Sequence, residues 1–252
     1  MSEPAIHLQR VTKRYGQKPA VRELDLSIRY GELFAFLGPN GAGKTTTIKM
    51  IAGLLQPNEG SVEVCGIRMG NDGLAAKAQL AYVPDLPFVY DKLTGREFLY
   101  FVAEMYGVPV RDRDERLSGL SVRLDMDSFL DQLAESYSHG MKQKVALAAA
   151  LLHEPRVLVI DEPMVGLDPR SVRVVKDLFV ERARRGCTVF MSTHTLEVAE
   201  AVADRIGIIH AGRLVAAGTL AELRGTASRE HSLERIFLDL TGGEGNGPVE
   251  TV

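Results

Sequence analysis

The sequence contains no long hydrophobic run, and this is the first thing that limits its function. Its longest uninterrupted apolar stretch is VALAAALL, which begins at residue 145. This is less than half of the ~18 to 20 residues that a membrane-spanning helix needs. The N-terminal stretch MSEPAIHLQR has neither the basic start nor the apolar core of a secretory signal peptide. We therefore expect a soluble, cytoplasmic protein.

The sequence also has few cysteines and only a small net charge. The only cysteines, Cys65 and Cys187, form no disulfide framework and lack the spacing of metal ligands. We interpret both as small buried side chains in a reducing compartment. The formal net charge of −3 gives no general electrostatic reason to bind nucleic acid, so we predict no nucleic-acid partner.

The chain does have the length and composition of an ordinary globular protein. It has 252 residues, of which 45% are hydrophobic and 25% charged. Two alternating stretches near the N-terminus, IHLQRVT and RELDLSI, favour half-exposed antiparallel strands. Continuous apolar runs are typical of parallel strands covered on both faces. There are four: LFAFL at residue 33, VLVI at 157, TVFM at 188 and IGII at 206.

Helical patterns fill much of the remaining sequence. A helix is expected from Gly43 to Leu55, where QPNEG ends it. Residues 94–135 are mostly helical in pattern and contain no convincing buried strand. These patterns predict an α/β fold with a mostly parallel sheet, an N-terminal antiparallel β subdomain, and a helical subdomain inserted at about residues 86–155. The domain is expected to span residues 1–242, and the polar residues 243–252 to form a disordered tail.

The stretch GPNGAGKTT fits the phosphate-binding pattern G-x-x-x-x-G-K-[ST], with an apolar strand before it and a helix after it. Glycines let the backbone curl around a triphosphate, and the start of the helix directs its positive dipole end at the phosphates. Lys44 would reach the β- and γ-phosphates, and Thr45 would ligate Mg²⁺. The residues predicted to contact the nucleotide are Gly38, Asn40, Gly41, Ala42, Gly43, Lys44, Thr45 and Thr46.

Two carboxylates, Asp161 and Glu162, follow the apolar run VLVI. In a parallel sheet the ligand crevice lies beyond the carboxyl ends of the strands, where the phosphate-binding loop also lies. We expect Asp161 to hold Mg²⁺ through water, and Glu162 to orient or deprotonate the water that attacks the γ-phosphate. His194, in FMSTH, should reach the same edge and contact the γ-phosphate. An ordinary acidic pair and a structural histidine are the alternative interpretations.

In their order along the chain, these motifs resemble those of the ATP-binding subunits of ABC transporters, from about residue 6 to residue 242. GPNGAGKTT resembles the Walker A loop, YSHGMKQKV the signature motif, VLVIDEP the Walker B strand, GLDP the D-loop and STH the switch-histidine segment. The resemblance implies a P-loop NTPase that hydrolyses ATP with Mg²⁺. It also implies a head-to-tail dimer around two ATP molecules, in which Ser138 and Gly140 of one subunit cap the ATP bound by the other.

Further individual residues correspond to functional positions of the family. Tyr15 corresponds to the aromatic residue that stacks on adenine, although a surface tyrosine at a strand end is the alternative. Asp168 corresponds to the D-loop aspartate at the dimer interface. The segment AYVPDLPFVYDKLTGREFLYF resembles the Q-loop region, where the membrane permease of the family usually docks.

The sequence departs from the family pattern at two places. Asp85 stands where the family has the Q-loop glutamine, and we expect it to reach Mg²⁺ through water. Residues 137–141 read Y-S-H-G-M where L-S-G-G-Q is usual. This signature and the ending SLERIFLDLTG resemble a bacterial exporter branch whose ATPase and permease are separate chains, in particular the Ecs-type and drug-export members.

The resemblance therefore implies the ATP-hydrolysing subunit of an exporter, with a second ATP-binding subunit and a separate permease as partners. Such a subunit would lie on the inner face of the cell membrane, held there by the permease. An ABC ATPase acting on a cytosolic assembly complex, of the iron–sulfur assembly type, is the alternative. The cargo, and whether the two ATP-binding subunits are identical, stay open.

Overall fold

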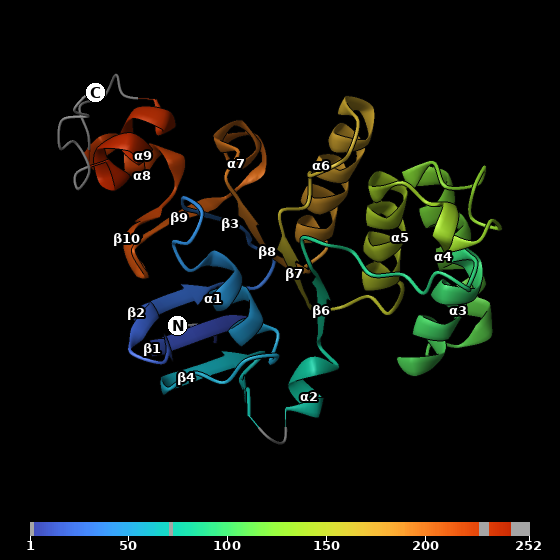
Figure 1. Ribbon diagram of the computed structural model, residues 1–252, viewed down its shortest axis with the longest axis horizontal. Coiled ribbons are helices and arrows are strands. Elements are labelled where there is room, and N and C mark those ends of the chain that lie inside the picture. The colour runs from blue at the N-terminus through green and yellow to red at the C-terminus, as the bar shows by residue number, and fades with distance from the viewer. Residues whose placement is uncertain (1–2, 71–72, 227–231, 243–252) are drawn as a thin grey trace, which may run out of the picture.

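The computed structural model describes residues 3–70, 73–226 and 232–242. The polar segment 243–252, expected to be a disordered tail, lies outside the described residues. Two β-sheets and the helices around them make up the described chain (Figure 1).

A six-stranded sheet of order β10-β9-β3-β8-β7-β6 forms the centre of the molecule. Strands β6, β7, β8, β3 and β9 are parallel, and β10 joins one edge antiparallel. Every residue of β3, β7 and β8 is buried, as expected for strands covered on both faces. The predicted α/β core with a mostly parallel sheet is confirmed. The strands are β3 (Leu33–Leu37), β6 (Leu80–Val83), β7 (Val157–Asp161), β8 (Thr188–Thr193), β9 (Arg205–His210) and β10 (Arg213–Gly218).

The second sheet is antiparallel and is formed near the N-terminus. Its order is β2-β1-β4-β5, and its strands are β1 (Ile6–Tyr15), β2 (Lys18–Ile28), β4 (Glu59–Val64) and β5 (Ile67–Arg68). Helix α1 (Lys44–Ile51) packs against strands of both sheets, and a shared hydrophobic cluster fills the space between them. A short helix, α2 (Leu74–Lys77), follows β5.

Helix α1 is shorter than its apolar spacing predicts. The expected end at Leu55 is wrong, because the helix ends at Ile51 and Gly53 then adopts a φ of 67°. A glycine in this left-handed conformation just after the last turn is a common helix terminator. The apolar residues beyond it therefore continue the hydrophobic face without continuing the helix.

Between β6 and β7 the chain is helical. It forms α3 (Gly95–Met105), α4 (Val110–Leu124), a 3₁₀ turn (Ala134–Ser136) and α5 (His139–Leu152), grouped at the right of Figure 1. Helix α3 starts at a capping box: the Thr94 hydroxyl accepts from the Glu97 amide at 3.2 Å, and Glu97 accepts from the Thr94 amide at 2.8 Å. One hydrophobic cluster runs from the central sheet into these helices.

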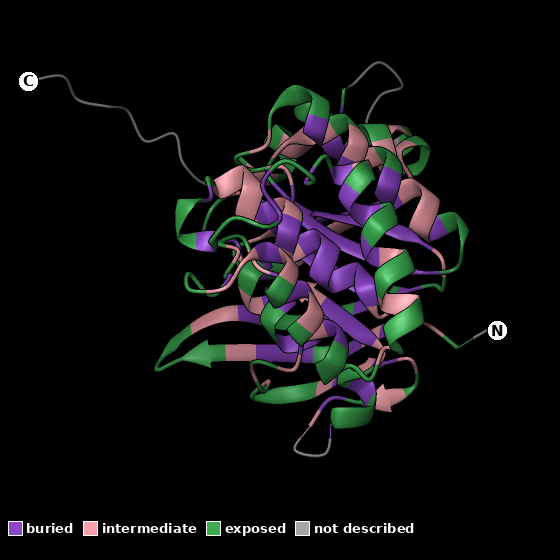
Figure 2. Cartoon of the chain, turned by 90° about the vertical axis from the view of Figure 1, so that its right-hand side faces the viewer, coloured by how far each residue is buried: buried purple, intermediate pink, exposed green. Residues whose placement is uncertain are grey.

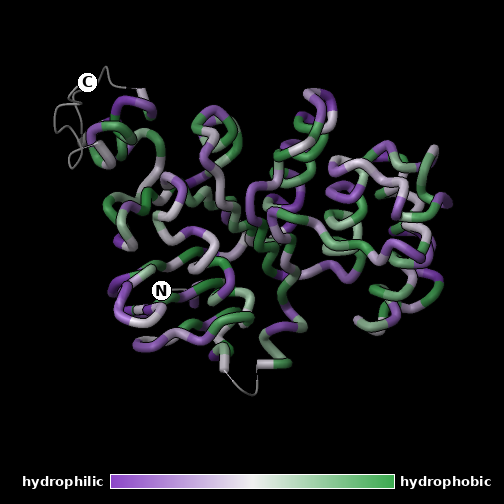
Figure 3. Tube along the Cα trace, in the orientation of Figure 1, coloured by the Kyte–Doolittle hydropathy of each residue, from purple (hydrophilic) through white to green (hydrophobic). Residues whose placement is uncertain are grey.

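The last four helices are α6 (Pro169–Arg184), α7 (Leu196–Val202), α8 (Leu220–Thr226) and α9 (Leu233–Thr241). Helix α6 is amphipathic and contains both hydrophobic and hydrophilic residues (Figure 3). It buries Val175, Leu178 and Phe179. Buried residues concentrate along the central strands and on the helix faces turned toward them (Figure 2). Within the described part of the chain, no helix has the length and apolar character needed to cross a membrane.

Candidate functional site

The loop at residues 38–43 connects β3 to α1 and is tightly enclosed. A Cβ atom on Gly38 would lie 2.5 Å from the carbonyl oxygen of Ile209 in β9. A Cβ atom on Gly43 would lie 2.6 Å from the carbonyl oxygen of Ala20 in β2, and the φ of Gly43 is 112°. Only glycine fits such close backbone approaches and such a φ without strain. The loop is therefore fixed between the two sheets.

Lys44 begins α1 and places its ammonium inside this loop. Its Nζ donates to the carbonyl oxygens of Gly38 at 2.7 Å and Pro39 at 3.3 Å, and the residue is only 7% exposed. Burial lowers the pKa of the Lys44 ammonium, while the nearby charges of Glu162 and Asp161 act to raise it. Of the other predicted nucleotide contacts, Asn40, Gly41 and Thr45 are exposed, Thr46 is half-buried and Ala42 is buried.

Asp161 ends β7 and is almost completely buried, with 1% of its surface exposed. The hydroxyl of Ser192, directly opposite in β8, donates to its Oδ1 atom. Among the described residues, its Oδ2 atom has no hydrogen-bond partner. An unpaired buried polar atom costs about 1–3 kcal/mol. A hard cation such as Mg²⁺, which prefers oxygen ligands, fits this carboxylate.

Glu162 follows directly and holds its carboxylate between the imidazole of His194 and the ammonium of Lys44. Its Oε1 lies 2.9 Å from Nδ1 of His194 and 4.0 Å from Nζ of Lys44. Its backbone has a φ of 49°, and its amide donates to the carbonyl and hydroxyl oxygens of Ser192 at 3.2 and 3.3 Å. The structure thus brings Lys44 together with Glu162 and His194 at one edge of the sheet.

Ser192 is the residue of this site that the sequence reasoning missed. It touches both members of the acidic pair, although it is fully buried in β8. A serine directly after a run of apolar residues is the sequence signal that could have indicated it. A buried hydroxyl almost always has a hydrogen-bond partner.

Asp85 follows β6 and lies on the same side of the sheet, because β6 is the parallel neighbour of β7. It is exposed, and its Oδ1 accepts from the amide of Leu86 at 2.9 Å. Burial raises the pKa of the Tyr82 hydroxyl to about 12, with further contributions from the charges of Asp161 and Asp85. Both carboxylates therefore act on one phenol at this edge.

The signature residues lie at the start of α5. Ser138 is exposed and caps the helix, its hydroxyl accepting from the Met141 amide at 3.2 Å. The Ser138 amide donates to Sδ of Met141 at 3.4 Å. Met141 thus makes the return contact that a glutamate or glutamine makes in an ordinary capping box. Gly140 is tightly packed, since a Cβ there would lie 2.7 Å from the carbonyl oxygen of Gly166.

Asp168 and Tyr15 lie on exposed surface. Asp168 caps α6 and accepts from the amides of Arg170 and Ser171 at 3.0 Å. The hydroxyl of Ser171 and these amides lower the pKa of Asp168 to about 2. Tyr15 ends β1 with 55% of its surface exposed, in the hairpin whose second strand contacts Gly43. Tyr15 pairs with Lys18 of β2, and the charge of Lys144 in α5 also acts on Asp168.

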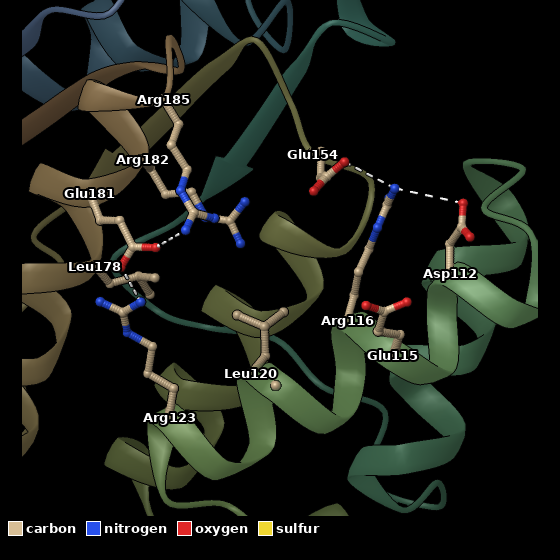
Figure 4. Close-up of a pocket in the computed structure, with 11 residues that line it drawn as sticks. Asp112, Glu115, Arg116, Leu120, Arg123, Glu154, Leu178, Glu181, Arg182 and Arg185 are labelled. Atoms are coloured by element: carbon tan, nitrogen blue, oxygen red, sulfur yellow. Dashed lines mark hydrogen bonds and ion pairs between the residues drawn. The ribbon is translucent and has the colours of Figure 1, made fainter.

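A separate cleft of about 510 Å³ lies between α4 and α6 (Figure 4). Its lining includes four arginines and four carboxylates. Arg123 pairs with Glu181, which also lies 2.8 Å from Arg185, and Arg116 lies 2.9 Å from Glu154. None of the predicted site residues lines this cleft, so it is distinct from the site at the sheet edge.

Residues 21–165, more than half of the chain, match the sequence model of the family described as ABC transporter. The chain belongs to the ABC transporter family. It is 35% identical over 232 residues to the ABC-type transporter ATP-binding protein EcsA of Bacillus subtilis (strain 168), covering 92% of this chain and 94% of that protein. It is 36% identical to the linearmycin resistance ATP-binding protein LnrL of the same strain, covering 86% and 70%.

A solved structure similar to this ABC cassette is that of a dimeric ATP-binding cassette in a post-hydrolysis state, bound to ADP and phosphate. The two share 26% identity with a TM-score of 0.75, over 85% of this chain and 98% of that chain. The chain is thus an ATP-binding and ATP-hydrolysing ABC transporter subunit. The dimeric relative supports a second ATP-binding subunit as its partner.

Proposed function

We propose that this ABC cassette powers a separate membrane permease, as the ATPase subunit of an exporter. The observation that carries the proposal is the meeting of Lys44, Glu162 and His194 beside the buried Asp161 at one edge of the sheet. This arrangement provides a phosphate-binding ammonium, a base and a metal-binding carboxylate within one site.

In this proposal, the glycine loop and Lys44 hold the phosphates of ATP, and the exposed ring of Tyr15 stacks on adenine. Thr45 and Asp161 would hold Mg²⁺, Asp161 through water from its unpaired Oδ2 atom, and Asp85 would also contribute through water. The bound metal supplies charge neutralisation at the phosphate oxygens.

Glu162 orients the attacking water and accepts its proton, and the exposed imidazole of His194 contacts the γ-phosphate. Ser192 fixes the backbone that carries Glu162. In the dimer, Ser138 and Gly140 of the partner subunit close over the γ-phosphate and exclude other water molecules. Unpaired amides at the start of α5 suit that contact with an anion. Asp168 lies at the dimer interface.

An exposed apolar surface beside Asp85 supports a protein partner. The ring of Tyr90 contacts Phe88, Phe98 and Phe101, at centroid distances of 5.1, 6.1 and 6.2 Å. Phe88 is 67% exposed, and exposed apolar patches mark interaction sites. We assign this surface, formed by Leu86, Phe88, Tyr90, Phe101 and Met105, to the permease. The cassette would then lie on the inner face of the cell membrane, and export agrees with the resistance relative.

An ABC ATPase acting on a cytosolic assembly complex would use the same surface, so the partner must be identified. The full chain is tagged, expressed in its own cells, and purified after detergent solubilisation. We expect a protein with membrane-spanning helices to co-purify with wild type and with Val122→Asp, a matched exposed position on α4, and to be lost with Phe88→Asp. Recovery of a cytosolic complex in its place would favour the alternative.

A further inference from the structure

His139 stands where the usual signature motif has a glycine, and its side chain makes a contact that glycine cannot make. The imidazole packs on Gly166: a Cβ atom on Gly166 would lie 2.2 Å from Cδ2 and 3.1 Å from Cγ of His139. The φ of Gly166 is 76°, a second reason for glycine there. Residues 139 and 166 therefore fit each other as a pair.

Two more contacts join the same elements. Gly140 lies so close to the carbonyl oxygen of Gly166 that a Cβ would approach it to 2.7 Å. Gln143, one turn further along α5, is 1% exposed and donates to the carbonyl oxygen of Pro163 at 3.2 Å. The start of α5 is thus joined to the segment 163–166 at both ends of that segment, Pro163 and Gly166.

That segment connects two residues of the proposed mechanism. It follows Glu162, which serves the ATP held by this chain, and it leads to Asp168 at the dimer interface. The turn it contacts carries Ser138, which serves the ATP held by the partner subunit. In one chain, then, the His139–Gly166 contact lies between residues that belong to two different ATP sites.

We propose that His139 is a positioning residue that transmits the closure of one ATP site to the other. This inference rests on the proposed dimer and deepens it. A shift of the segment after Glu162 pushes directly on the imidazole and moves the turn that carries Ser138. With glycine at position 139, the space of the imidazole would be free, and only the contacts of Gly140 and Gln143 would link the segment to the turn. A smaller part of the shift would then reach Ser138.

The imidazole of His139 also buries a polar atom. Among the described residues, Nε2 has no hydrogen-bond partner although it is buried. Burying an unpaired polar atom costs free energy. The packing of the ring on Gly166 therefore has to offset this cost.

The test measures ATPase rate against ATP concentration, using the full chain with ATP and Mg²⁺. For two positively coupled sites the Hill coefficient exceeds 1 and cannot exceed the number of sites. We expect His139→Gly to lower the Hill coefficient toward 1. The association constant of the ATP-driven dimer should fall by about 2- to 30-fold. The ATP affinity of the isolated monomer should not change. A merely structural residue would lower the melting temperature and leave the Hill coefficient intact, and that result would overturn the proposal.

Two further variants separate ring packing from folding defects. His139→Phe keeps a ring against Gly166 and should retain cooperativity; its behaving like His139→Gly would contradict transmission through the ring. Gly166→Ala should impair wild type by collision with the imidazole, and should cost less in the His139→Gly background. A wild-type chain that neither dimerises with ATP nor co-purifies with a second ATP-binding subunit would refute the proposed dimer itself. A cooperative wild type with an equally cooperative His139→Gly variant would refute only this inference.

Discussion

The Oε1 atom of Glu162 lies 2.9 Å from Nδ1 of His194. The two residues come from the ends of different strands, β7 and β8, and meet because these strands are parallel neighbours. Glu162 is largely shielded, with 16% of its side chain exposed, whereas the His194 side chain is 60% exposed. The histidine can therefore face a ligand while it orients the carboxylate.

Glu162→Gln tests this relationship. The amide keeps the shape of the side chain but cannot accept a proton, so we expect phosphate release to fall by about 10²- to 10⁴-fold. ATP binding should persist, and an ATP-bound dimer should accumulate in size-exclusion chromatography. Glu197→Gln, an exposed position on α7, is the matched control. Wild-type turnover by Glu162→Gln would show that this carboxylate is not the base.

Lys44→Ala should abolish nucleotide binding, because it removes the buried ammonium inside the glycine loop. Lys49→Ala removes an exposed ammonium from the last turn of the same helix and should bind ATP normally. Titration with a fluorescent ATP analogue measures both. Equal affinities in the two variants would refute the assignment of this loop to the phosphates.

Ser192→Ala should both destabilise the fold and slow hydrolysis. It leaves Oδ1 of the buried Asp161 without its hydroxyl partner, at a cost of about 1–3 kcal/mol in the free energy of unfolding. Urea unfolding and phosphate release check the two effects. Ser136→Ala, at an exposed hydroxyl bonded to the carbonyl oxygen of Leu133, should change little. If Ser192→Ala unfolds like wild type, the contact to Asp161 contributes nothing to stability.

Stability should decrease in mild acid because of His153. Burial lowers the pKa of its imidazole, stacked 3.7 Å from the ring of Tyr106, to about 4, and the charge of Arg116 acts in the same direction. In the unfolded chain the pKa of histidine is about 6.5. The unfolded chain therefore binds the proton more readily, and the contribution of His153 is complete above pH ~6.5 and lost toward pH ~4.

His153→Phe keeps the stacked ring and removes the titrating group. The free energy of unfolding, measured in urea between pH ~7 and pH ~4, should fall less steeply for this variant than for wild type. Parallel curves for the two proteins would show that His153 does not contribute to the acid sensitivity.

The central sheet was largely predictable because its strands are buried on both faces. Continuous apolar runs predicted β3, β7, β8 and β9, and the parallel arrangement predicted that Lys44, Asp161 and His194 would share one edge. Strands β4 and β10 carry weaker signals: β4 begins with Glu59 and Gly60, and only the last residue of β10 is buried. Strand β4 forms because it pairs with β1, far away in the sequence, and β10 forms because it pairs with β9 in a local hairpin.

Contacts between distant residues account for what the sequence could not show at the site. Ser192 is 31 residues from Asp161 in sequence, and only the strand register places them opposite each other. Met141 replaces the usual signature glutamine, yet its sulfur still accepts a hydrogen bond from the amide of Ser138. The packing of His139 on Gly166 likewise depends on how α5 approaches the segment after β7.

The hydrophobic cluster that includes Leu33 and Ile160 of the central sheet continues into Leu120, Leu130 and Leu147 of the helical part without a break. These helices share their apolar interior with the sheet. A fragment containing only the helices would therefore expose a large apolar surface to water. Both parts should therefore unfold together on heating, and calorimetry should show a single unfolding peak.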